Sequence, residues 1–550
     1  MNTLLDLCLT LSPPSSNAPE GVIADIEIRC DALGLQPMTV QPLRDPFTPT
    51  ERRELEWYLE TYWQWPYEGF ADRGQRVEHL LVEAGKRLYR AVFDQAQPIV
   101  QPWRLLPDAR RQLSIIGNVP SALSLPWELL CDEQGFLALR TKNPVSIIRR
   151  LPQTELGALP IPMALPLRVL LVTARPDDAG FVDPRGIARE LLDEVQPQIS
   201  AGAIALEFLR PPTRAALRER LSQSPPIHIL HFDGHGTFRD TGSDTGLTDD
   251  GKVLSGGAQG MLAFEKDDGS LDLAPADELA QMLQDSGVRL AVLTACQSAK
   301  GASDDLFSSV AARMIRSGVD AVVAMSASVL VASAAKYVEA FYRRLASGEA
   351  VTLAHERARQ ALHDNPERHL HQRHLDEAGT PVRLKDWWLP HFYLQRPLNF
   401  EVGQAASLPT GSSQRRVENQ TASPANLGQA GSLSHTLPPA PRYGFTGRAK
   451  ELHKIERWLL RGSAVVVHGF GGTGKTTLAR ESADWLTRTG MYANVCFVSF
   501  EHGGDAAMLL SALGHRLGLD FDARDTSAAL AALKQHVQST GLWSLKNKCT

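Results

Sequence analysis

Two apolar runs decide the fold of this chain: Ile227-His-Ile-Leu-His-Phe-Asp-Gly-His235-Gly and, further along, Arg289-Leu-Ala-Val-Leu-Thr-Ala-Cys296-Gln-Ser. Each run is rich enough in apolar and β-branched residues to form a buried strand of a parallel sheet. Each also ends in small residues, where a side chain can project into a crevice. In open α/β sheets, ligands bind at the carboxyl ends of the strands. We therefore expect His235 and Cys296 to lie at matching strand ends, over the same groove.

The sequence around the first run alternates between strand and helix patterns. Strand patterns lie at Leu167–Ala174, Ala203–Leu209 and Ile227–Phe232, and helix patterns lie at Gly186–Ile199 and Thr213–Ser222. Such alternation implies right-handed crossovers between parallel strands. The fold class that we predict is therefore α/β, with a mainly parallel sheet and flanking helices.

Further elements extend this sheet on both sides of the two runs. Strand patterns at Leu4–Leu11 and Ile23–Arg29 begin the chain. Residues Thr237–Gly260 are too rich in glycine and acid for a core, and we expect a functional loop there that borders the site. The stretch Asp386–Leu394 contains Pro390 and is expected to be a closing edge strand, because proline within a strand is tolerated mainly at edges.

A cysteine and a histidine over one groove can perform nucleophilic catalysis. A thiolate attacks a carbonyl, and a nearby imidazole can keep the thiolate ionised and later protonate the leaving amine. We assign these roles to Cys296 and His235, with the backbone N–H groups of Gly236 and Cys296 as donors to the oxyanion. Gly234 and Gly236 would let the chain turn sharply and approach a substrate.

These residues also allow a structural role. A cysteine after a buried strand is often only a small core residue. The paired strand-end placement and the flanking glycines favour catalysis here. His228 and His231 lie within the strand pattern, and we expect them to be packed and hydrogen-bonded rather than catalytic.

The same residues carry a family resemblance. Thr294-Ala-Cys296-Gln-Ser resembles the caspase signature Q-A-C-[RQG]-G, and Cys296 follows His235 by 61 residues (296 − 235 = 61), near the ~50 of that signature. The signature's last glycine is Ser298 in this chain, a departure that leaves the dyad intact.

Two more motifs complete the resemblance. With Leu125-Pro-Trp-Glu-Leu-Leu and the Phe232-Asp-Gly-His-Gly turn, the span from about Leu11 to Pro397 resembles the CHAT family of prokaryotic caspase-like cysteine peptidases. The resemblance implies a caspase-hemoglobinase-like fold, cleavage of protein substrates, and His235 and Cys296 as the dyad. The peptidase site would require no cofactor.

The residues that would select the substrate are less defined by the sequence. Asp177 and Asp304 follow strand ends and could line a pocket for Arg or Lys, whereas Arg175 could hold an acidic residue instead. Asp304 also fits the start of a helix, where acids are favoured at the amino end. The sequence does not decide between the two kinds of pocket.

A second signal is the stretch Gly469-Phe-Gly-Gly-Thr-Gly474-Lys475-Thr476, which fits the phosphate-binding pattern G-x-x-x-x-G-K-[ST]. It follows an expected strand, Ala464–His468, and opens an expected helix, Lys475–Arg488, with a next strand at Val495–Phe500. Backbone N–H groups of such a turn cradle phosphates. The residues that we expect to bind ATP or ADP are Gly469, Gly471, Gly472, Thr473, Gly474, Lys475, Thr476 and Thr477, with Mg²⁺ held through Thr476.

The stretch Phe445-Thr-Gly-Arg448-Ala-Lys-Glu-Leu resembles the motif that leads into the nucleotide domain of STAND-type ATPases, including NB-ARC proteins. The resemblance implies that Arg448 lies near the nucleotide and that the chain can self-associate through this domain. A solvated charge at a helix start is the alternative for Arg448. No apolar strand ending in an acidic pair occurs between Lys475 and Thr550, so ATP hydrolysis stays undecided, and we expect a truncated domain.

Composition limits the remaining possibilities. The chain has 43% hydrophobic and 22% charged residues and a net charge of −5, which argues against a nucleic-acid surface. Its six cysteines have no C-x-x-C spacing, so neither zinc nor a disulfide framework is indicated. The start at Met1 lacks the positive charge and small-residue cleavage site of a secretory signal, so we expect a first strand there, and the most apolar run, Ala321–Ala335, is shorter than the ~20 residues of a membrane span. We expect a cytoplasmic protein without a membrane partner.

Together these patterns predict four regions. They are 1–160, the N-terminal α/β region of the CHAT-like part; 161–400, the peptidase core; 401–441, a flexible linker rich in Gly, Ser, Pro, Asn and Gln; and 442–550, the first part of a P-loop NTPase domain. The function that we expect is a cysteine endopeptidase coupled to a nucleotide switch, in a setting of prokaryotic defence or regulated cell death. The alternative is a nucleotide-dependent signalling or assembly protein whose caspase-like domain is a non-catalytic scaffold.

Overall fold

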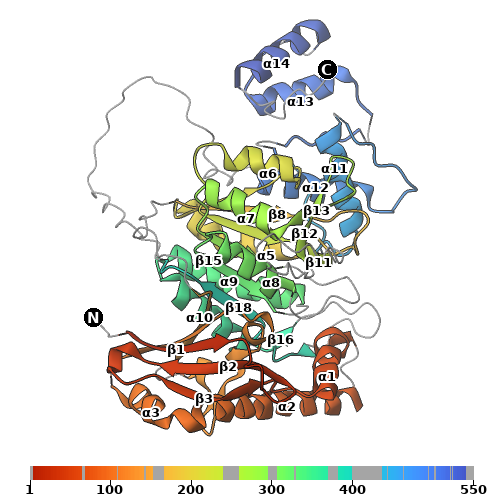
Figure 1. Cartoon of the computed structure of the whole chain (residues 1–550). Coiled ribbons are helices and arrows are strands. Elements are labelled where there is room, and N and C mark those ends of the chain that lie inside the picture. Colours follow the sequence, from red (N-terminus) through yellow and green to blue (C-terminus); the bar gives the residue numbers. More distant parts are fainter. Residues whose placement is uncertain are drawn as a thin grey trace. The chain divides into compact units, whose positions relative to one another are not determined.

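The structure is a computed structural model of the chain (Figure 1). It describes residues 4–64, 69–107, 109–140, 144–152, 166–239, 259–294, 306–326, 330–368, 382–398, 437–442, 444–462, 464–492, 495–500, 503–520, 522 and 524–540. The chain divides into two compact units, Met1–Ser413 and Gln414–Thr550.

All the described strands belong to the first unit. They are β1 (Leu4–Ser12), β2 (Val22–Arg29), β3 (Met38–Arg44), β4 (Arg110–Gly117), β5 (Cys131–Asp132), β6 (Gly135–Phe136), β7 (Val145–Arg150), β8 (Leu167–Thr173), β9 (Ile204–Phe208), β10 (Ile229–Asp233), β11 (His235–Arg239), β12 (Gln259–Glu265), β13 (Leu271–Pro275), β14 (Leu290–Leu293), β15 (Ala321–Met325), β16 (Glu367–Arg368), β17 (Val382–Arg383) and β18 (Pro390–Leu394).

Helices surround these strands in the first unit and make up the regular structure of the second. In the first unit they are α1 (Pro49–Glu60), α2 (Gly69–Phe93), α3 (Gln97–Leu105), α4 (Pro120–Leu123), α5 (Gly186–Ser200), α6 (Arg214–Leu221), α7 (Ala276–Asp285), α8 (Leu306–Arg316), α9 (Val331–Ala346) and α10 (Val351–Asp364). In the second they are α11 (Ala449–Arg461), α12 (Lys475–Arg488), α13 (Ala506–Leu517) and α14 (Thr526–Thr540).

The first unit is built on an 11-stranded sheet in the order β3-β2-β1-β4-β7-β18-β15-β14-β10-β8-β9. Its neighbours are mostly parallel, and the antiparallel pairs in this order are β15–β18, β1–β2 and β2–β3. The predicted α/β class with a mainly parallel sheet is confirmed. Strands β10, β14 and β15 are buried along their whole length, which explains why they read as continuous apolar runs.

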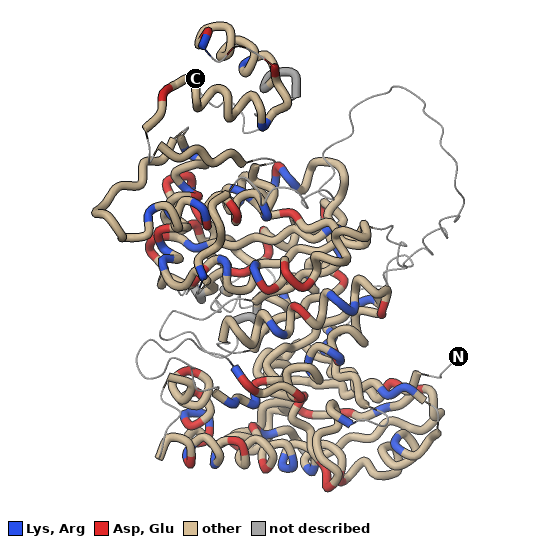
Figure 2. Tube along the Cα trace, turned by 180° about the vertical axis from the view of Figure 1, so that it is seen from behind, with Lys and Arg blue, Asp and Glu red and all other residues tan. Residues whose placement is uncertain are grey.

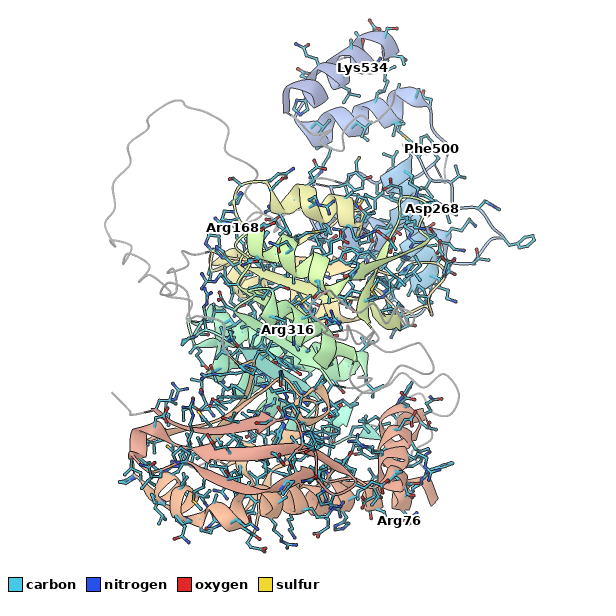
Figure 3. The ribbon with its side chains drawn as sticks, viewed as in Figure 1. Arg76, Arg168, Asp268, Arg316, Phe500 and Lys534 are labelled. Atoms are coloured by element: carbon cyan, nitrogen blue, oxygen red, sulfur yellow. The ribbon has the colours of Figure 1, made fainter. Side chains whose placement is uncertain are left out.

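Helices cover the sheet in groups that pack on one another. Helix α9 packs against α5 and α10, and α7 packs against α6, α8 and the strands β12 and β13. Helix α2 lies along β3 (Figure 1). Side chains fill the space between these layers (Figure 3). Acidic and basic residues are interspersed along the described chain, as on an ordinary globular surface (Figure 2).

Strand β18 lies between β7 and β15, so the prediction of an edge strand at Asp386–Leu394 is wrong. Pro390 is the first residue of the strand, where a missing N–H interrupts no ladder. The pairing begins there, because Pro390 is the register partner of Met325. Just before it, the Leu389 carbonyl accepts a hydrogen bond from the Ser326 N–H at 2.8 Å.

The predicted loop Thr237–Gly260 is also partly wrong. Its first residues lie in β11 and its last ones in β12, and these strands pair antiparallel and continue into β13 as a 3-stranded sheet. The glycine and polar residues of this stretch are not typical of strands. The pairing depends on contacts between distant segments, so the local sequence does not predict it. Residues 240–258 fall outside the described part of the chain.

A group of buried charged residues joins the helices to the sheet. Glu128 accepts hydrogen bonds from Arg149 of β7 at 2.7 and 2.9 Å, and all three side chains of Glu128, Arg149 and Arg359 are inaccessible to solvent. The Arg359 guanidinium of α10 lies 3.6 Å from the same carboxylate. Burial alone would raise the pKa of Glu128, but Arg149 and the other cations around it lower this pKa to about 2.

The second unit differs from its prediction in one respect. Helices α11 and α12 pack through a core of Leu452, Ile455 and Leu478. Residues 464–468 and 495–500, which we expected to be strands, are described without regular secondary structure. A strand needs a paired neighbour to satisfy its backbone groups, and the apolar pattern alone does not supply one.

Candidate functional site

The register of the sheet sets two strand ends side by side. Strand β10 lies between β8 and β14, with Phe232 paired to Leu293 and Asp233 paired to Thr173. His235 follows Phe232 by three residues, and Cys296 follows Leu293 by three residues. Adjacent strands run about 4.8 Å apart. Cys296 itself, like Asp304, lies outside the described residues.

His235 begins strand β11 and is buried, with 6% of its surface exposed. It pairs with Ala263 of β12, and the neighbouring Gly236 pairs with Leu262. In an antiparallel ladder, successive N–H groups point alternately toward the partner strand and away from it. The role of the Gly236 N–H as an oxyanion donor stays a prediction.

Gly234 separates the end of β10 from His235, and the reason for this glycine differs from the one expected. Its backbone is outside the left-handed region. A Cβ there would lie 2.7 Å from two ring atoms of Phe232 and 3.4 Å from the Ala174 carbonyl oxygen. Space, not a sharp turn, therefore requires glycine at this position.

The sequence did not reveal a buried ion pair beside His235. Arg175 Nη2 lies 2.8 Å from Asp233 Oδ1, and Arg175 Nη1 donates to the Asp233 carbonyl at 2.7 Å. Burial raises the pKa of Asp233, whereas Arg175 and His235 act to lower it. The Arg175 N–H donates to Glu265 Oε1 of β12 at 2.8 Å, which ties the small sheet to β8.

This geometry bears on the predicted specificity pocket. The Arg175 guanidinium also donates to the carbonyls of Val182 and Ala174, at 3.1 and 3.0 Å, so it is engaged inside the fold. Asp177 is exposed after β8, and its N–H donates to Gly269 in the turn between β12 and β13, where Asp268 is labelled in Figure 3. The substrate-binding roles of Arg175, Asp177 and Asp304 stay predictions.

His228 and His231 are packed and hydrogen-bonded, as predicted. His231 Nε2 lies 2.7 Å from Thr294 Oγ1, and its ring stacks on Tyr342 of α9. His228 Nδ1 accepts from the Arg168 N–H at 3.2 Å. Burial lowers the pKa of both imidazoles, to about 3 for His231, so both are neutral near pH 7.

The glycine-rich loop of the second unit has a form that suits phosphate. Gly469, Gly472 and Gly474 have φ of 155°, 76° and 77°, which side chains rarely adopt. Lys475 is the first residue of α12, and its Nζ donates to the carbonyls of Gly469 and Phe470 at 3.0 and 2.8 Å. The ammonium group therefore lies over the loop.

The other residues predicted for this site are placed around the same loop. Thr473 Oγ1 donates to the Phe470 carbonyl at 2.9 Å, Thr476 is exposed, and Thr477 is half-buried. Gly471 is exposed and has open space around its Cα. The helix that follows directs its N–H groups at the loop, where an anion is favoured.

Arg448 contacts this loop from the start of α11. Its Nη1 donates to the Thr473 carbonyl at 2.9 Å, and its Nε donates to Glu451 Oε1 at 3.2 Å. The Arg448 backbone is left-handed, with φ of 54°. The structure thus brings Arg448 to the loop, while its contact with a nucleotide stays a prediction.

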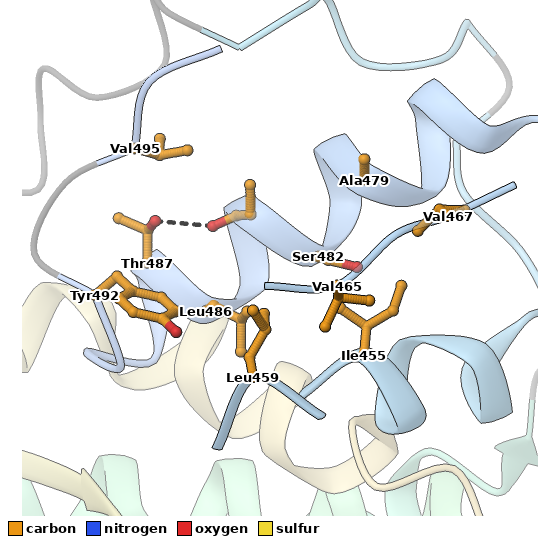
Figure 4. Close-up of a pocket in the computed structure, with 11 residues that line it drawn as sticks. Ile455, Leu459, Val465, Val467, Ala479, Ser482, Leu486, Thr487, Tyr492 and Val495 are labelled. Atoms are coloured by element: carbon orange, nitrogen blue, oxygen red, sulfur yellow. Dashed lines mark hydrogen bonds between the residues drawn. The ribbon is translucent and has the colours of Figure 1, made fainter. Parts of the chain in front are cut away.

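An apolar pocket of about 220 Å³ lies beside α12, the helix that follows the glycine-rich loop (Figure 4). Its lining comes from α11, α12 and the segments at residues 465–467 and 492–495: Ile455, Leu459, Val465, Val467, Ala479, Ser482, Ala483, Leu486, Thr487, Tyr492 and Val495. Its few polar groups include Thr487, whose hydroxyl donates to the Ala483 carbonyl at 2.8 Å. Its chemistry is therefore unlike that of a phosphate site.

The described residues hold neither a candidate metal site nor a candidate membrane span. No group of three or more His, Cys, Asp or Glu side chains among them could hold a metal ion. The described helices are each too short or too polar to span a membrane.

Solved structures with similar folds are distant. Gingipain R, an Arg-specific cysteine proteinase, is 11% identical over 56% of this chain and 68% of its own, at a TM-score of 0.32. A complex of Porphyromonas gingivalis RgpB pro- and mature domains is 12% identical over 59% and 76%, at 0.31. The Saccharomyces cerevisiae separase–securin complex is 11% identical over 71% of this chain but 30% of that chain, at 0.35. These TM-scores are too low to carry a function over.

Family models give a firmer result. No curated protein matches the chain. The model of the AAA domain matches residues 460–546, which hold the glycine-rich loop, whereas a relation to STAND or NB-ARC proteins stays a prediction. The model of the CHAT domain matches residues 82–399, more than half of the chain. The resemblance expected from the motifs around His235 and Cys296 is thereby confirmed, and the chain belongs to the CHAT domain family.

Proposed function

We propose that the first unit is a cysteine endopeptidase, with Cys296 as nucleophile and His235 as general base and acid. The observation that carries the proposal is the pairing of β10 with β14, because Phe232 and Leu293 are partners and each precedes one member of the dyad by three residues. Parallel neighbours end at the same side of a sheet, so a ligand groove at these strand ends would bring the two residues together.

The proposed chemistry follows that of thiol peptidases. The Cys296 thiolate adds to the carbonyl carbon of the scissile bond, and backbone N–H groups receive the oxyanion. His235, protonated by the thiol, gives its proton to the leaving amine, and the C–N bond breaks. Water then hydrolyses the thioester: His235 removes one proton from the water and passes it to the Cys296 sulfur, so the carboxylic acid leaves and the thiol is regenerated.

The substrates would be proteins, and the structure favours one of the two pockets left open. Asp177 presents an exposed side chain after β8, at the edge of the sheet where β10 also ends. Arg175, the candidate for holding an acidic residue, is engaged by Asp233. We therefore propose that an Arg or Lys of the substrate is recognised, with Asp177 as the first candidate.

A cleavage profile tests the peptidase proposal. The full chain and its Cys296→Ala variant are incubated with a proteome-derived peptide library, and new peptide ends are identified by mass spectrometry. We expect new ends with the parent and none above background with the variant. Identical profiles would refute peptidase activity and support the scaffold alternative.

We propose further that the second unit binds ATP or ADP with Mg²⁺, and the fold of the loop supports this. Lys475 would leave the carbonyls of Gly469 and Phe470 for the terminal phosphates, Thr476 would hold Mg²⁺, and Arg448 would border the nucleotide. The lysine supplies a charge, and hydrogen bonds to charged groups contribute about 1.5–3 kcal/mol each.

The Lys475→Ala variant is expected to bind a fluorescent ATP analogue with Mg²⁺ at least about tenfold more weakly than the parent, since about 1.4 kcal/mol corresponds to tenfold. Equilibrium titration of the full chain measures this. The matched control is Lys454→Ala, which removes an exposed lysine of α11 and should leave the affinity unchanged. Equal affinity of parent and Lys475→Ala would contradict nucleotide binding at the loop.

A nucleotide-dependent assembly is the second candidate function. The second unit exposes large apolar side chains, among them Trp458, Val466 at 81% and Phe470 at 88% exposure. Where such residues adjoin one another, the exposed apolar patch that they form is typical of an association surface. Sedimentation of the parent with and without MgATP tests the candidate: a nucleotide-driven change of mass supports self-association of the STAND type, and an unchanged mass contradicts it.

A further inference from the structure

A hydrogen bond between side chains links the two strands that lead to the proposed dyad. His231 is the third residue of β10, and Thr294 directly follows β14. His231 is the register partner of Val292, and Thr294 follows Val292 by two residues, so both side chains lie on one face of the sheet. The bond spans 2.7 Å, between His231 Nε2 and Thr294 Oγ1.

The direction of this bond follows from burial. Neither side chain is accessible to solvent, and burial lowers the pKa of His231 to about 3, so the imidazole is neutral and carries one N–H. His231 Nδ1 has no hydrogen-bond partner within the described part of the chain. An orphaned buried N–H is rarer than an unused lone pair. Nε2 therefore carries the hydrogen and donates to the threonine hydroxyl.

Both partners of the bond are fixed by further contacts. The His231 ring stacks on Tyr342 of α9, with 5.7 Å between ring centroids and 13° between ring planes. The Thr294 N–H donates to the Phe232 carbonyl at 3.0 Å. Thr294 is thus held to β10 by its backbone and by its side chain, and Cys296 comes two residues later.

We propose that His231 is a positioning residue of the peptidase site, which acts through the Thr294 hydroxyl to hold the end of β14, and so Cys296, in place against His235. The inference rests on the proposed function. Misplacement of a reacting group by about 1 Å can cost on the order of 100-fold in rate. A threonine without this bond would still fill the core but would fix the strand end less well.

The test measures the reactivity of Cys296 and needs no substrate. The full chain is treated with iodoacetamide between pH 6 and pH 9, and the rate at Cys296 is followed by peptide mass spectrometry. If His235 holds the thiolate, the parent reacts readily at pH 6, where an isolated thiol is almost fully protonated. Thr294→Val, which keeps the shape but removes the hydroxyl, is expected to lower the rate at pH 6 about tenfold.

Two further variants separate positioning from packing. Thr294→Ser keeps the hydroxyl and should restore the rate at pH 6 to within about threefold of the parent. Thr173→Val is the matched control, because Thr173 ends the neighbouring strand β8 and its Oγ1 meets no hydrogen-bond partner in the described part. It should react as the parent does.

The outcomes are distinguishable. If the parent reacts at pH 6 and Thr294→Val reacts at the same rate, the positioning role is overturned and the peptidase proposal stays intact. The role also falls if Thr294→Ser reacts as slowly as Thr294→Val, since the methyl group would then be what matters. A parent whose Cys296 behaves as an isolated thiol overturns the proposed dyad and this inference with it.

Discussion

Replacing His235 with alanine is expected to lower kcat/KM for peptide cleavage by about 100- to 10,000-fold, the contribution of a positioned general acid and base. The histidine is the first residue of β11, buried at the edge of the sheet where β10 and β14 end. The two histidines that come before it in the chain are already engaged: His231 of β10 is held by Thr294, and Nδ1 of His228, just before β10, accepts from the Arg168 N–H. Cleavage of a peptide selected from the library profile measures the loss.

A matched control for this variant is His228→Ala. It removes a neighbouring histidine that precedes β10, at the opposite end of the strand from His235. A net loss of about 0.5–1.5 kcal/mol in stability is expected from the lost hydrogen bond, with kcat/KM within about threefold of the parent. If His235→Ala retains more than about a tenth of the parent rate while Cys296→Ala is inactive, His235 is not the base.

Local patterns predicted the strands of the sheet better than their order. The runs that form β8, β10 and β14 are apolar because both faces of these strands are buried. Burial on both faces produces consecutive apolar residues, which are visible in the local sequence. The place of β18 depends on β7 and β15, which are remote in the sequence. Proline suggested an edge, and only the three-dimensional pairing shows that Pro390 begins a central strand.

The candidate site shows the same division. Position after a buried strand singled out His235, whose catalytic role stays a prediction, and the glycine pattern predicted that Lys475 begins α12, as it does. The partners of Arg175 could not be predicted from the local sequence, because Asp233 and Glu265 lie 58 and 90 residues further along the chain. Thr294 stood in the motif around Cys296, but its bond to His231 depends on the strand register.

One signal for the buried charges is present in the sequence. Glu128 stands in Leu125-Pro-Trp-Glu-Leu-Leu, where every neighbour is apolar or proline. A charged residue in such a run is rarely buried unless it is paired. The pattern therefore indicates a buried partner, but it does not identify Arg149 or Arg359.

Replacing Glu128 with alanine is expected to lower the free energy of unfolding of the first unit by about 3–5 kcal/mol, the cost of removing one partner of a buried ion pair. The carboxylate compensates the Arg149 guanidinium through two hydrogen bonds and lies 3.6 Å from Arg359. Without it, two buried cations remain with no counter-charge at this position. Urea unfolding followed by circular dichroism measures the change.

Two other substitutions test whether the lost charge causes the lower free energy of unfolding of Glu128→Ala. Glu54→Ala breaks a pair of the same chemistry, with Arg73 at 2.7 Å, but on the surface of α1, where such pairs contribute about 0.2–1 kcal/mol. Glu128→Gln keeps the shape and one acceptor while removing the charge. If Glu128→Gln lowers the free energy of unfolding nearly as much as Glu128→Ala, the uncompensated guanidinium groups dominate the loss. If Glu128→Gln lowers it no more than Glu54→Ala, the loss in Glu128→Ala comes from volume and packing around Glu128. In that case the buried ion pair is not what holds α10 to the sheet.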